Sequence, residues 1–136
     1  MARRSDQRRA AAFALYQSDL TGRPLGDTMP RDATLFTRAL ALATEDRRDE
    51  LDEQIARHAK GWTVERIAPL ERAILRTALL EMLHPDAVPA DAPIPPEGAI
   101  EEAVRTAKTY AGAQSPSFVN GILAAVLREM RENQPA

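Results

Sequence analysis

The most apolar stretch of the chain reads Pro69-Leu70-Glu71-Arg72-Ala73-Ile74-Leu75-Arg76-Thr77-Ala78-Leu79-Leu80-Glu81-Met82-Leu83. Its large apolar side chains recur at intervals of three and four residues, which places them on one side of an α-helix. Proline suits the first position of a helix, and the pair His84-Pro85 marks the end of this one. We therefore expect a helix over residues 69–83 at the centre of the fold.

Helical spacing also governs the sequence on both sides of this stretch. Alanine and leucine dominate there, while β-branched and aromatic residues are scarce and never alternate with the period of a strand. Further helices are expected over residues 8–20, from about residue 30 to a break near 44–48, from that break to Gly61, from Gly98 to Gly112, and from a capping Ser115 onward, with a short turn over 63–66. The sequence thus predicts an all-α protein of about six to seven helices.

Three segments are expected to lie outside these helices. Residues 1–7 read as a flexible basic arm, and residues 132–136 as a frayed tail. Residues 85–98 read as a proline-rich loop, because five of the twelve residues in 85–96 are proline. We treat residues 1–136 as a single domain that includes these three segments.

Composition narrows the class of protein. A chain of 136 residues with 44% hydrophobic residues is long enough for one domain with its own core. It has no cysteine for disulfides or thiolate metal sites, and no apolar run that could span a bilayer. No signal peptide is evident, so a cytoplasmic protein is the default expectation.

The side chains needed for catalysis or cofactor binding are poorly represented. The two histidines, His58 and His84, have no neighbours at metal-ligand spacing, and no glycine-rich loop follows a strand. Adjacent carboxylates such as Glu101-Glu102 are explained by the helix dipole and by solubility. We therefore expect no enzymatic activity, no metal site and no cofactor.

Positive charge gathers at the N-terminus. Residues 1–9 carry four arginines and one aspartate, a side-chain charge of +3, although the whole chain has a net charge of −2. Arg4 and Arg8 share one helix face on what we expect to be a solvated arm, with Arg3 and Arg9 beside them. Guanidinium groups bind phosphates and stack on unpaired bases, so this arm is a candidate RNA contact. The alternative is a terminus kept polar only for solubility.

Two further features stand out. In Phe118-Val119-Asn120-Gly121 a glycine lies one turn into a helix, where it costs about 1 kcal/mol relative to alanine. Close packing against another helix is the ordinary explanation for such a glycine. Trp62 is the only tryptophan, and we expect its ring to fill the core between two helices.

The order of several motifs along the chain resembles the NusB family of transcription antitermination factors. The motifs are Arg8-Arg9, Ala14-Leu15-Tyr16-Gln17, Gly61-Trp62, Arg66-Ile67, Leu70-Glu71-Arg72-Ala73-Ile74-Leu75-Arg76, Leu80-Glu81, Ala99-Ile100-Glu101-Glu102-Ala103-Val104, Ala107-Lys108 and Phe118-Val119-Asn120-Gly121. The resemblance covers about residues 4–130, and the ordered set is more specific than any single motif.

This resemblance implies a compact fold of two packed helical bundles and a role without catalysis. Proteins of the family pair with NusE, the small-subunit ribosomal protein, and the pair binds the single-stranded boxA element of nascent RNA. RNA polymerase carries the assembly through terminators, chiefly in ribosomal RNA operons. A homodimer of the free protein is also possible.

The resemblance assigns roles to particular residues. The RNA-contacting arginines of the family fall on Arg4 and Arg8, with Arg3 and Arg9 nearby. Gln114 and Ser115 fall in a loop that borders the RNA. Phe118 and Glu71 fall at the interface with the ribosomal protein. The arm is thinner than in some relatives, because Ser5 and Asp6 stand where those carry arginines, so weak binding of RNA alone is expected.

Two other interpretations remain open. Similar domains occur as accessories of RNA cytosine methyltransferases, although we expect no methyl-donor-binding domain in a sequence of 136 residues. A structural helical protein without an RNA role is the second. A partly exposed Phe118 near Glu71 favours a docking surface, whereas a buried Phe118 favours a purely structural role.

Overall fold

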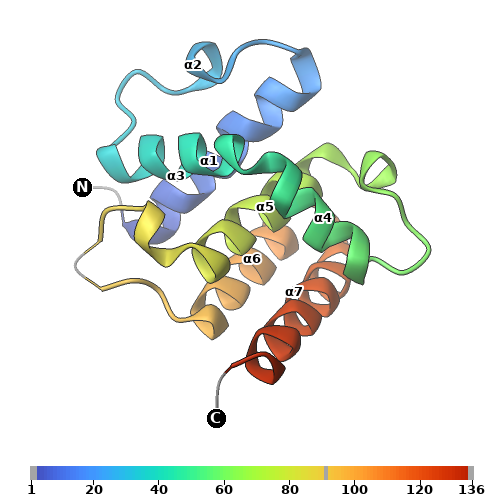
Figure 1. The fold of residues 1–136 in the computed structure, drawn as a ribbon. Coiled ribbons are helices and arrows are strands. Elements are labelled where there is room, and N and C mark those ends of the chain that lie inside the picture. Colours follow the sequence, from blue (N-terminus) through green and yellow to red (C-terminus); the bar gives the residue numbers. More distant parts are fainter. Residues whose placement is uncertain (1–2, 91, 135–136) are drawn as a thin grey trace.

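The computed structural model describes residues 3–90 and 92–134, and over these residues the chain forms α-helices and 3-10 turns but no strand (Figure 1). The elements are α1 (Arg4–Thr21), α2 (Leu25–Thr28), α3 (Leu35–Asp46), α4 (Arg48–His58), η1 (Val64–Arg66), α5 (Pro69–Leu83), η2 (Pro85–Ala87), α6 (Pro96–Tyr110) and α7 (Ser115–Glu132). The predicted all-α class is confirmed, and so is the break near residues 44–48, since α3 ends at Asp46 and α4 begins at Arg48.

Helix α5 lies at the centre of the molecule, as its apolar sequence predicts. Every residue from Ala73 to Met82 is buried, and α5 packs against α1, α3, α4, α6 and α7. Helices α1–α3 form one group and α4, α6 and α7 a second, with α5 shared between the two (Figure 1). This is the arrangement of two packed bundles that the resemblance implies.

Two charged residues lie within this buried run, and both are paired. Arg76 of α5 donates two hydrogen bonds to the carboxylate of Asp52 on α4, at 2.7 and 2.9 Å, and lies 3.5 Å from Asp19 of α1. Glu81 accepts two hydrogen bonds from the Arg8 side chain of α1. Because buried charges are tolerated when paired, these contacts tie α1 and α4 to the central helix.

The N-terminal boundary differs from the prediction. Helix α1 begins at Arg4 rather than Arg8, because the backbone N–H of Arg3 donates to the Asp6 side chain at 3.3 Å and Asp6 meets the helix dipole in the first turn. Residues 4–7 are therefore helical, and the expectation of a flexible arm is wrong for them. Residues 1 and 2 of that arm lie outside the described residues.

Other helix boundaries also shift. Helix α3 begins only at Leu35, where the Thr34 hydroxyl accepts from the backbone N–H of Thr37 at 3.2 Å, and the short α2 precedes it. The proline-rich segment is shorter than the predicted 85–98, because its first residues form η2 and α6 already begins at Pro96. Residue 91 of this loop and residues 135–136 of the predicted tail lie outside the described residues.

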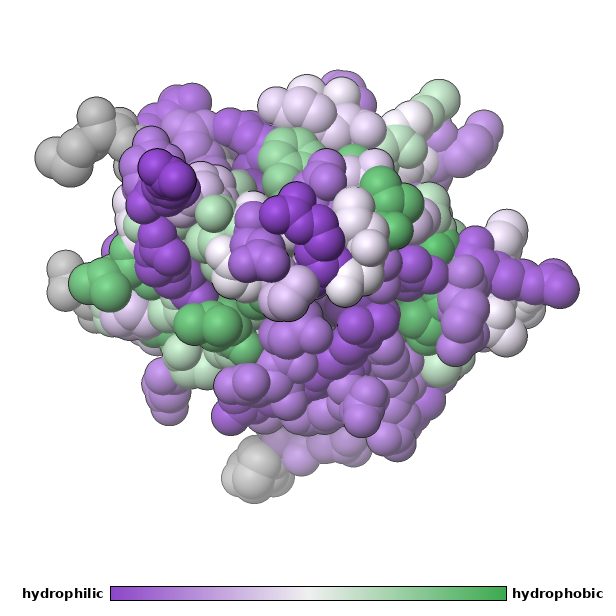
Figure 2. All heavy atoms as spheres, turned by 90° about the horizontal axis from the view of Figure 1, so that it is seen from above, coloured by the Kyte–Doolittle hydropathy of each residue, from purple (hydrophilic) through white to green (hydrophobic). Residues whose placement is uncertain are grey.

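The surface over α1–α3 shows no single apolar face. Figure 2 looks onto the top of the molecule as drawn in Figure 1, and its apolar side chains form separate patches in a largely hydrophilic surface. Leu35 and Leu42 of α3 are two exposed apolar side chains. In the part of the chain that the structure describes, no helix is both long and apolar enough to cross a membrane.

Candidate RNA and protein interface

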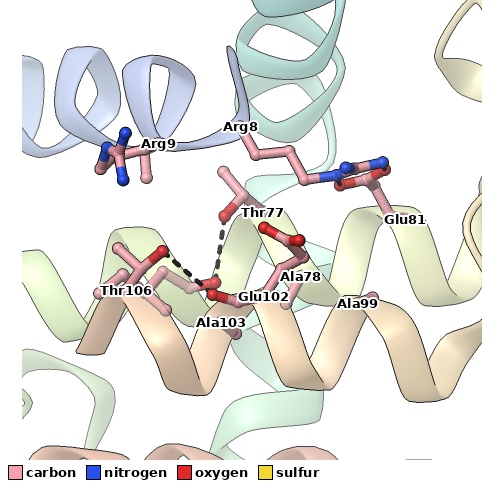
Figure 3. A pocket seen from close by; sticks show the side chains of 11 residues that line it. Arg8, Arg9, Thr77, Ala78, Glu81, Ala99, Glu102, Ala103 and Thr106 are labelled. Atoms are coloured by element: carbon pink, nitrogen blue, oxygen red, sulfur yellow. Dashed lines mark hydrogen bonds and ion pairs between the residues drawn. The ribbon is translucent and has the colours of Figure 1, made fainter. Parts of the chain in front are cut away.

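Arg8 is held against the central helix rather than exposed on an arm. Its Nε and Nη2 atoms donate to the two carboxylate oxygens of Glu81 at 2.8 and 3.0 Å, and its guanidinium lies 5.2 Å from the centre of the Phe36 ring. The two charged side chains are 16% and 7% exposed. Figure 3 shows this pair lying side by side between α1 and α5. The prediction of a solvated Arg8 is therefore wrong, because a buried carboxylate on a distant part of the chain engages it.

Arg3 and Arg4 do face the solvent. Arg4 is exposed, donates to the Gln7 side chain at 2.8 Å and lies 4.1 Å from the centre of the Phe36 ring. It has no carboxylate partner among the described residues. The Arg3 side chain is 85% exposed, with Asp6 at 3.8 Å. These two cations can meet a phosphate without breaking a buried ion pair.

Arg9 points away from Arg8 and toward α6 (Figure 3). Its guanidinium bonds to Asp6 and lies 5.6 Å from the centre of the Tyr110 ring. Tyr110 is 47% exposed and meets Phe13 of α1 edge-on, with ring centres 5.1 Å apart at 87°. Sequence reasoning missed Tyr110, because nothing in its local spacing distinguishes an exposed ring at a helix end from a core residue.

Gln114 and Ser115, where the loop before α7 meets the helix, differ in their exposure. Ser115 is only 3% exposed, and its hydroxyl donates to the Glu71 carboxylate at 2.7 Å. It is the first residue of α7 rather than the cap, a position that Gln114 takes. Gln114 is exposed beside it. Of the two predicted loop contacts, only Gln114 presents its side chain to an incoming ligand.

A hollow of about 190 Å³ lies next to this loop. Its lining residues come from η1 and the segments beside it, from α5 and from the start of α7, namely Trp62, Arg66, Ile67, Glu71, Gln114 and Phe118. The two aromatic rings form one wall, with their centres 6.1 Å apart at 68°. The hollow therefore combines an aromatic wall with one carboxylate, one guanidinium and one amide.

Trp62 does not fill the core, contrary to the prediction. It is 52% exposed. Gly61 takes a left-handed backbone conformation with φ of +79°, and the backbone N–H of Trp62 donates to the Ala59 carbonyl at 3.0 Å. This turn carries the chain off the end of α4 and leaves the indole on the surface.

Phe118 is half-buried and lines the hollow together with Glu71. This is the arrangement that the docking interpretation requires, since a purely structural phenylalanine would be fully covered. Neighbouring Val119, in contrast, is fully buried. The structure thus separates a core position from a surface position within one helical turn.

The arginines and the hollow lie at opposite ends of α5. Glu81 and Glu71 are ten residues apart, about 15 Å along a helix. Between them, Arg9 contacts Tyr110 at the end of α6, and Gln114, which lines the hollow, follows Tyr110 by four residues in the sequence. We call Arg3, Arg4, Arg9, Tyr110 and Gln114 the cationic strip. No cluster of side chains able to hold a metal ion occurs within residues 3–90 and 92–134.

Comparison with known proteins identifies relatives over most of the chain. The transcription antitermination protein NusB of Symbiobacterium thermophilum is 42% identical over 105 residues, which are 77% of this chain and 65% of that protein. NusB of Rubrobacter xylanophilus is 39% identical over 129 residues, covering 90% of this chain and 88% of the relative. The chain thus spans slightly less than two thirds of the first relative and most of the second.

The fold also occurs among solved structures. A crystal structure of the antitermination factors NusB and NusE in complex with double-stranded RNA contains a chain that matches with a TM-score of 0.77 and 24% identity. The match covers 93% of this chain and 96% of the other. At this level of identity the likeness establishes the arrangement of the helices alone.

The family model agrees with these individual relatives. The model described as the NusB family matches residues 5–128, which include all of α1 but its first residue, the hollow and most of α7. Since that range is well over half of the sequence, the chain belongs to the NusB family.

Proposed function

We propose that this protein is a transcription antitermination factor that binds boxA-type RNA jointly with NusE, the small-subunit ribosomal protein. The observations that carry the proposal are the exposed arginines at the start of α1, the contact of Arg9 with the exposed Tyr110 at the end of α6, and the aromatic hollow beside Gln114. The family relatives are named for transcription antitermination, which is not a catalysed reaction, and the protein is not an enzyme.

Charge on the strip supports weak binding of RNA by this chain alone. Arg8 is engaged by Glu81, and Arg3 and Arg9 both lie near Asp6. Arg4 is left without a carboxylate partner among the described residues. Because RNA affinity rises with the number of phosphates neutralised, so few available cations give a modest affinity. We therefore assign RNA contacts to Arg3, Arg4, Arg9 and Gln114, and give Arg8 and Ser115 supporting roles.

The hollow supports a protein partner. Aromatic side chains in a pocket, with polar groups at its rim, are typical of the residues that dominate binding energy at protein interfaces. Trp62 and Phe118 offer such a wall, and Glu71 and Arg66 offer charges of both signs. A partner seated here and carrying its own basic surface joins two weak RNA contacts into one and raises the apparent affinity.

Fluorescence anisotropy with a labelled boxA-type RNA tests this proposal. The RNA is titrated with this chain alone, with NusE alone and with both, over a series of salt concentrations. We expect weak, strongly salt-dependent binding for the chain alone and much tighter binding for the pair. Equal affinity with and without NusE would contradict joint binding.

The same experiment separates the other interpretations. A structural helical protein binds neither RNA nor NusE at any salt concentration. An accessory domain of an RNA methyltransferase binds RNA without any gain from NusE. Sedimentation of the same samples determines whether the free chain is a monomer or a homodimer. Assembly with RNA polymerase and action on ribosomal RNA operons are tested by transcription through a terminator downstream of boxA.

A further inference from the structure

Tyr110 occupies an unusual position for a large aromatic side chain. The buried residues of α6 are all alanines, at Ala99, Ala103 and Ala107. Tyr110 comes three residues after the last of these, at the final position of the helix, where the ring extends beyond the core. Nearly half of its surface is open, at 47% exposure. An aromatic ring left exposed at a helix end calls for a further explanation.

The ring is also held in a defined orientation. Phe13 of α1 meets it nearly perpendicularly, with centres 5.1 Å apart, and the Arg9 guanidinium lies 5.6 Å from its centre. The side chain hydroxyl makes no hydrogen bond to any described residue, so packing alone fixes the ring. A preoriented ring loses little conformational entropy when a flat ligand stacks on it.

We propose that Tyr110 is a stacking platform for an unpaired RNA base, with Arg9 contacting the adjacent phosphate. This inference rests on the proposed function and deepens it, because it assigns a base contact to Tyr110, which lies between the arginines of α1 and Gln114 in the set of residues proposed to bind RNA. Stacking on an aromatic side chain needs a base that is free of a duplex, which matches a single-stranded RNA ligand. The site holds a base by stacking and a phosphate by charge, and it does not distinguish one base from another.

The two residues make separable contributions to affinity. Stacking contributes about 1–3 kcal/mol per base, which corresponds to an affinity change of roughly 5- to 150-fold. It involves no counterion release, so the dependence of affinity on salt stays unchanged when stacking is lost. A phosphate contact from Arg9 contributes about 0.7 to the slope of log affinity against log salt for single strands.

The experiment compares variants in complex with NusE, using a single-stranded boxA-type RNA and a duplex of the same sequence. We expect Tyr110→Leu to lower single-strand affinity roughly 5- to 150-fold with an unchanged salt slope. Tyr110→Phe is expected to bind as the parent does, and Arg9→Gln is expected to reduce the salt slope. Lys108→Gln is the matched control, because Lys108 is exposed on the same helix two residues away and therefore on another face. Duplex affinity is expected to be equal for the parent and Tyr110→Leu.

Unchanged single-strand affinity of Tyr110→Leu, or an equal loss on duplex and single strand, would overturn the stacking role. The parent chain measured in the same series tests the proposed function separately, since only failure of the parent to bind contradicts it. If Tyr110→Leu is unfolded by circular dichroism, Tyr110→Met replaces it. The same loss of single-strand affinity with an unchanged salt slope is then expected, and an unchanged single-strand affinity overturns the inference.

Discussion

Arg8 of α1 and Glu81 of α5 form an ion pair with two hydrogen bonds that joins the N-terminal helix to the central one. The distances from Arg8 Nε and Nη2 to the two Glu81 carboxylate oxygens are 2.8 and 3.0 Å. The Glu81 side chain is 7% exposed and the Arg8 side chain 16%. Removing one member of a buried pair leaves the other charge desolvated and uncompensated, whereas removing both is often nearly neutral. The pair therefore fixes the start of α1 against the fold, and Arg4 and Arg9 project from that fixed helix.

We accordingly expect Arg8→Ala to destabilise the protein by about 3 kcal/mol, near the lower end of the range for a broken buried pair. For a chain of this length that loss lowers the melting temperature by roughly 10 °C. The double variant Arg8→Met, Glu81→Met is expected to recover most of the loss, because it leaves no buried charge. Thermal unfolding followed by circular dichroism measures both, and a melting temperature unaffected by Arg8→Ala would contradict the structural role.

Arg4→Ala is expected to act on RNA and not on the fold. Arg4 is exposed and has no carboxylate partner among the described residues, so its loss leaves no charge buried. The salt slope of RNA binding should fall by about 0.7, the value for one phosphate contact on a single strand. Arg23→Ala is the matched control, since Arg23 is exposed just beyond the other end of α1. Equal effects of the two substitutions on RNA affinity would rule out a specific contact at Arg4.

Local spacing was sufficient to predict the helices and the central place of α5. Residues 69–83 are the most apolar stretch because α5 is covered on all sides, and this composition can be read from the segment itself. Helix ends were predicted less well, because capping depends on individual side chains. The Asp6 side chain, for example, starts α1 four residues earlier than the apolar stripe indicates.

The candidate site depends on contacts that local spacing does not contain. Glu81 is 73 positions from Arg8, so nothing near the arginine indicates that it is engaged. Ser115 likewise donates its hydrogen bond to Glu71, which lies 44 residues away in the sequence. The exposure of Trp62 also contradicted a general preference of large aromatic residues for burial, because a left-handed Gly61 turns the chain outward.

Phe118→Asp is expected to abolish the complex with NusE while leaving the helicity of the chain unchanged. The side chain is half-buried in the wall of the hollow, so an exposed carboxylate there disrupts docking more than folding. Leu42→Asp, at an apolar residue of α3 that is 54% exposed, is the control and should bind NusE normally. Isothermal titration calorimetry and circular dichroism give the two readouts. A collapse of helicity in Phe118→Asp would assign the residue to the core instead.

Arg72 is expected to position the Trp62 side of the hollow. It donates to the carbonyls of Val64 and Glu65 at 3.3 and 3.1 Å, while its Nε and Nη2 atoms lie 3.1 and 2.9 Å from Asp19. Without this link η1 is released from α1 and α5, so Arg72→Ala should increase quenching of the single tryptophan by acrylamide and weaken NusE binding about tenfold. Arg48→Ala is the control, because Arg48 also contacts Asp19, at 3.2 Å, but makes no contact with η1. Identical quenching in the parent and Arg72→Ala would exclude the positioning role.

Gly121→Ala is expected to stabilise the isolated protein. The close helix packing that the sequence suggested is absent, since a Cβ at Gly121 would meet nothing within 4 Å and the residue is exposed on α7. Alanine removes the backbone entropy cost of a glycine in a helix, a gain of about 0.5–1 kcal/mol. Denaturant unfolding measures this gain, with Ala124→Gly as the converse substitution one turn further along α7. If Gly121→Ala instead destabilises the free chain, the inference that Gly121 faces open space is wrong. If the substitution stabilises the chain but weakens NusE binding, the glycine allows close approach of the partner.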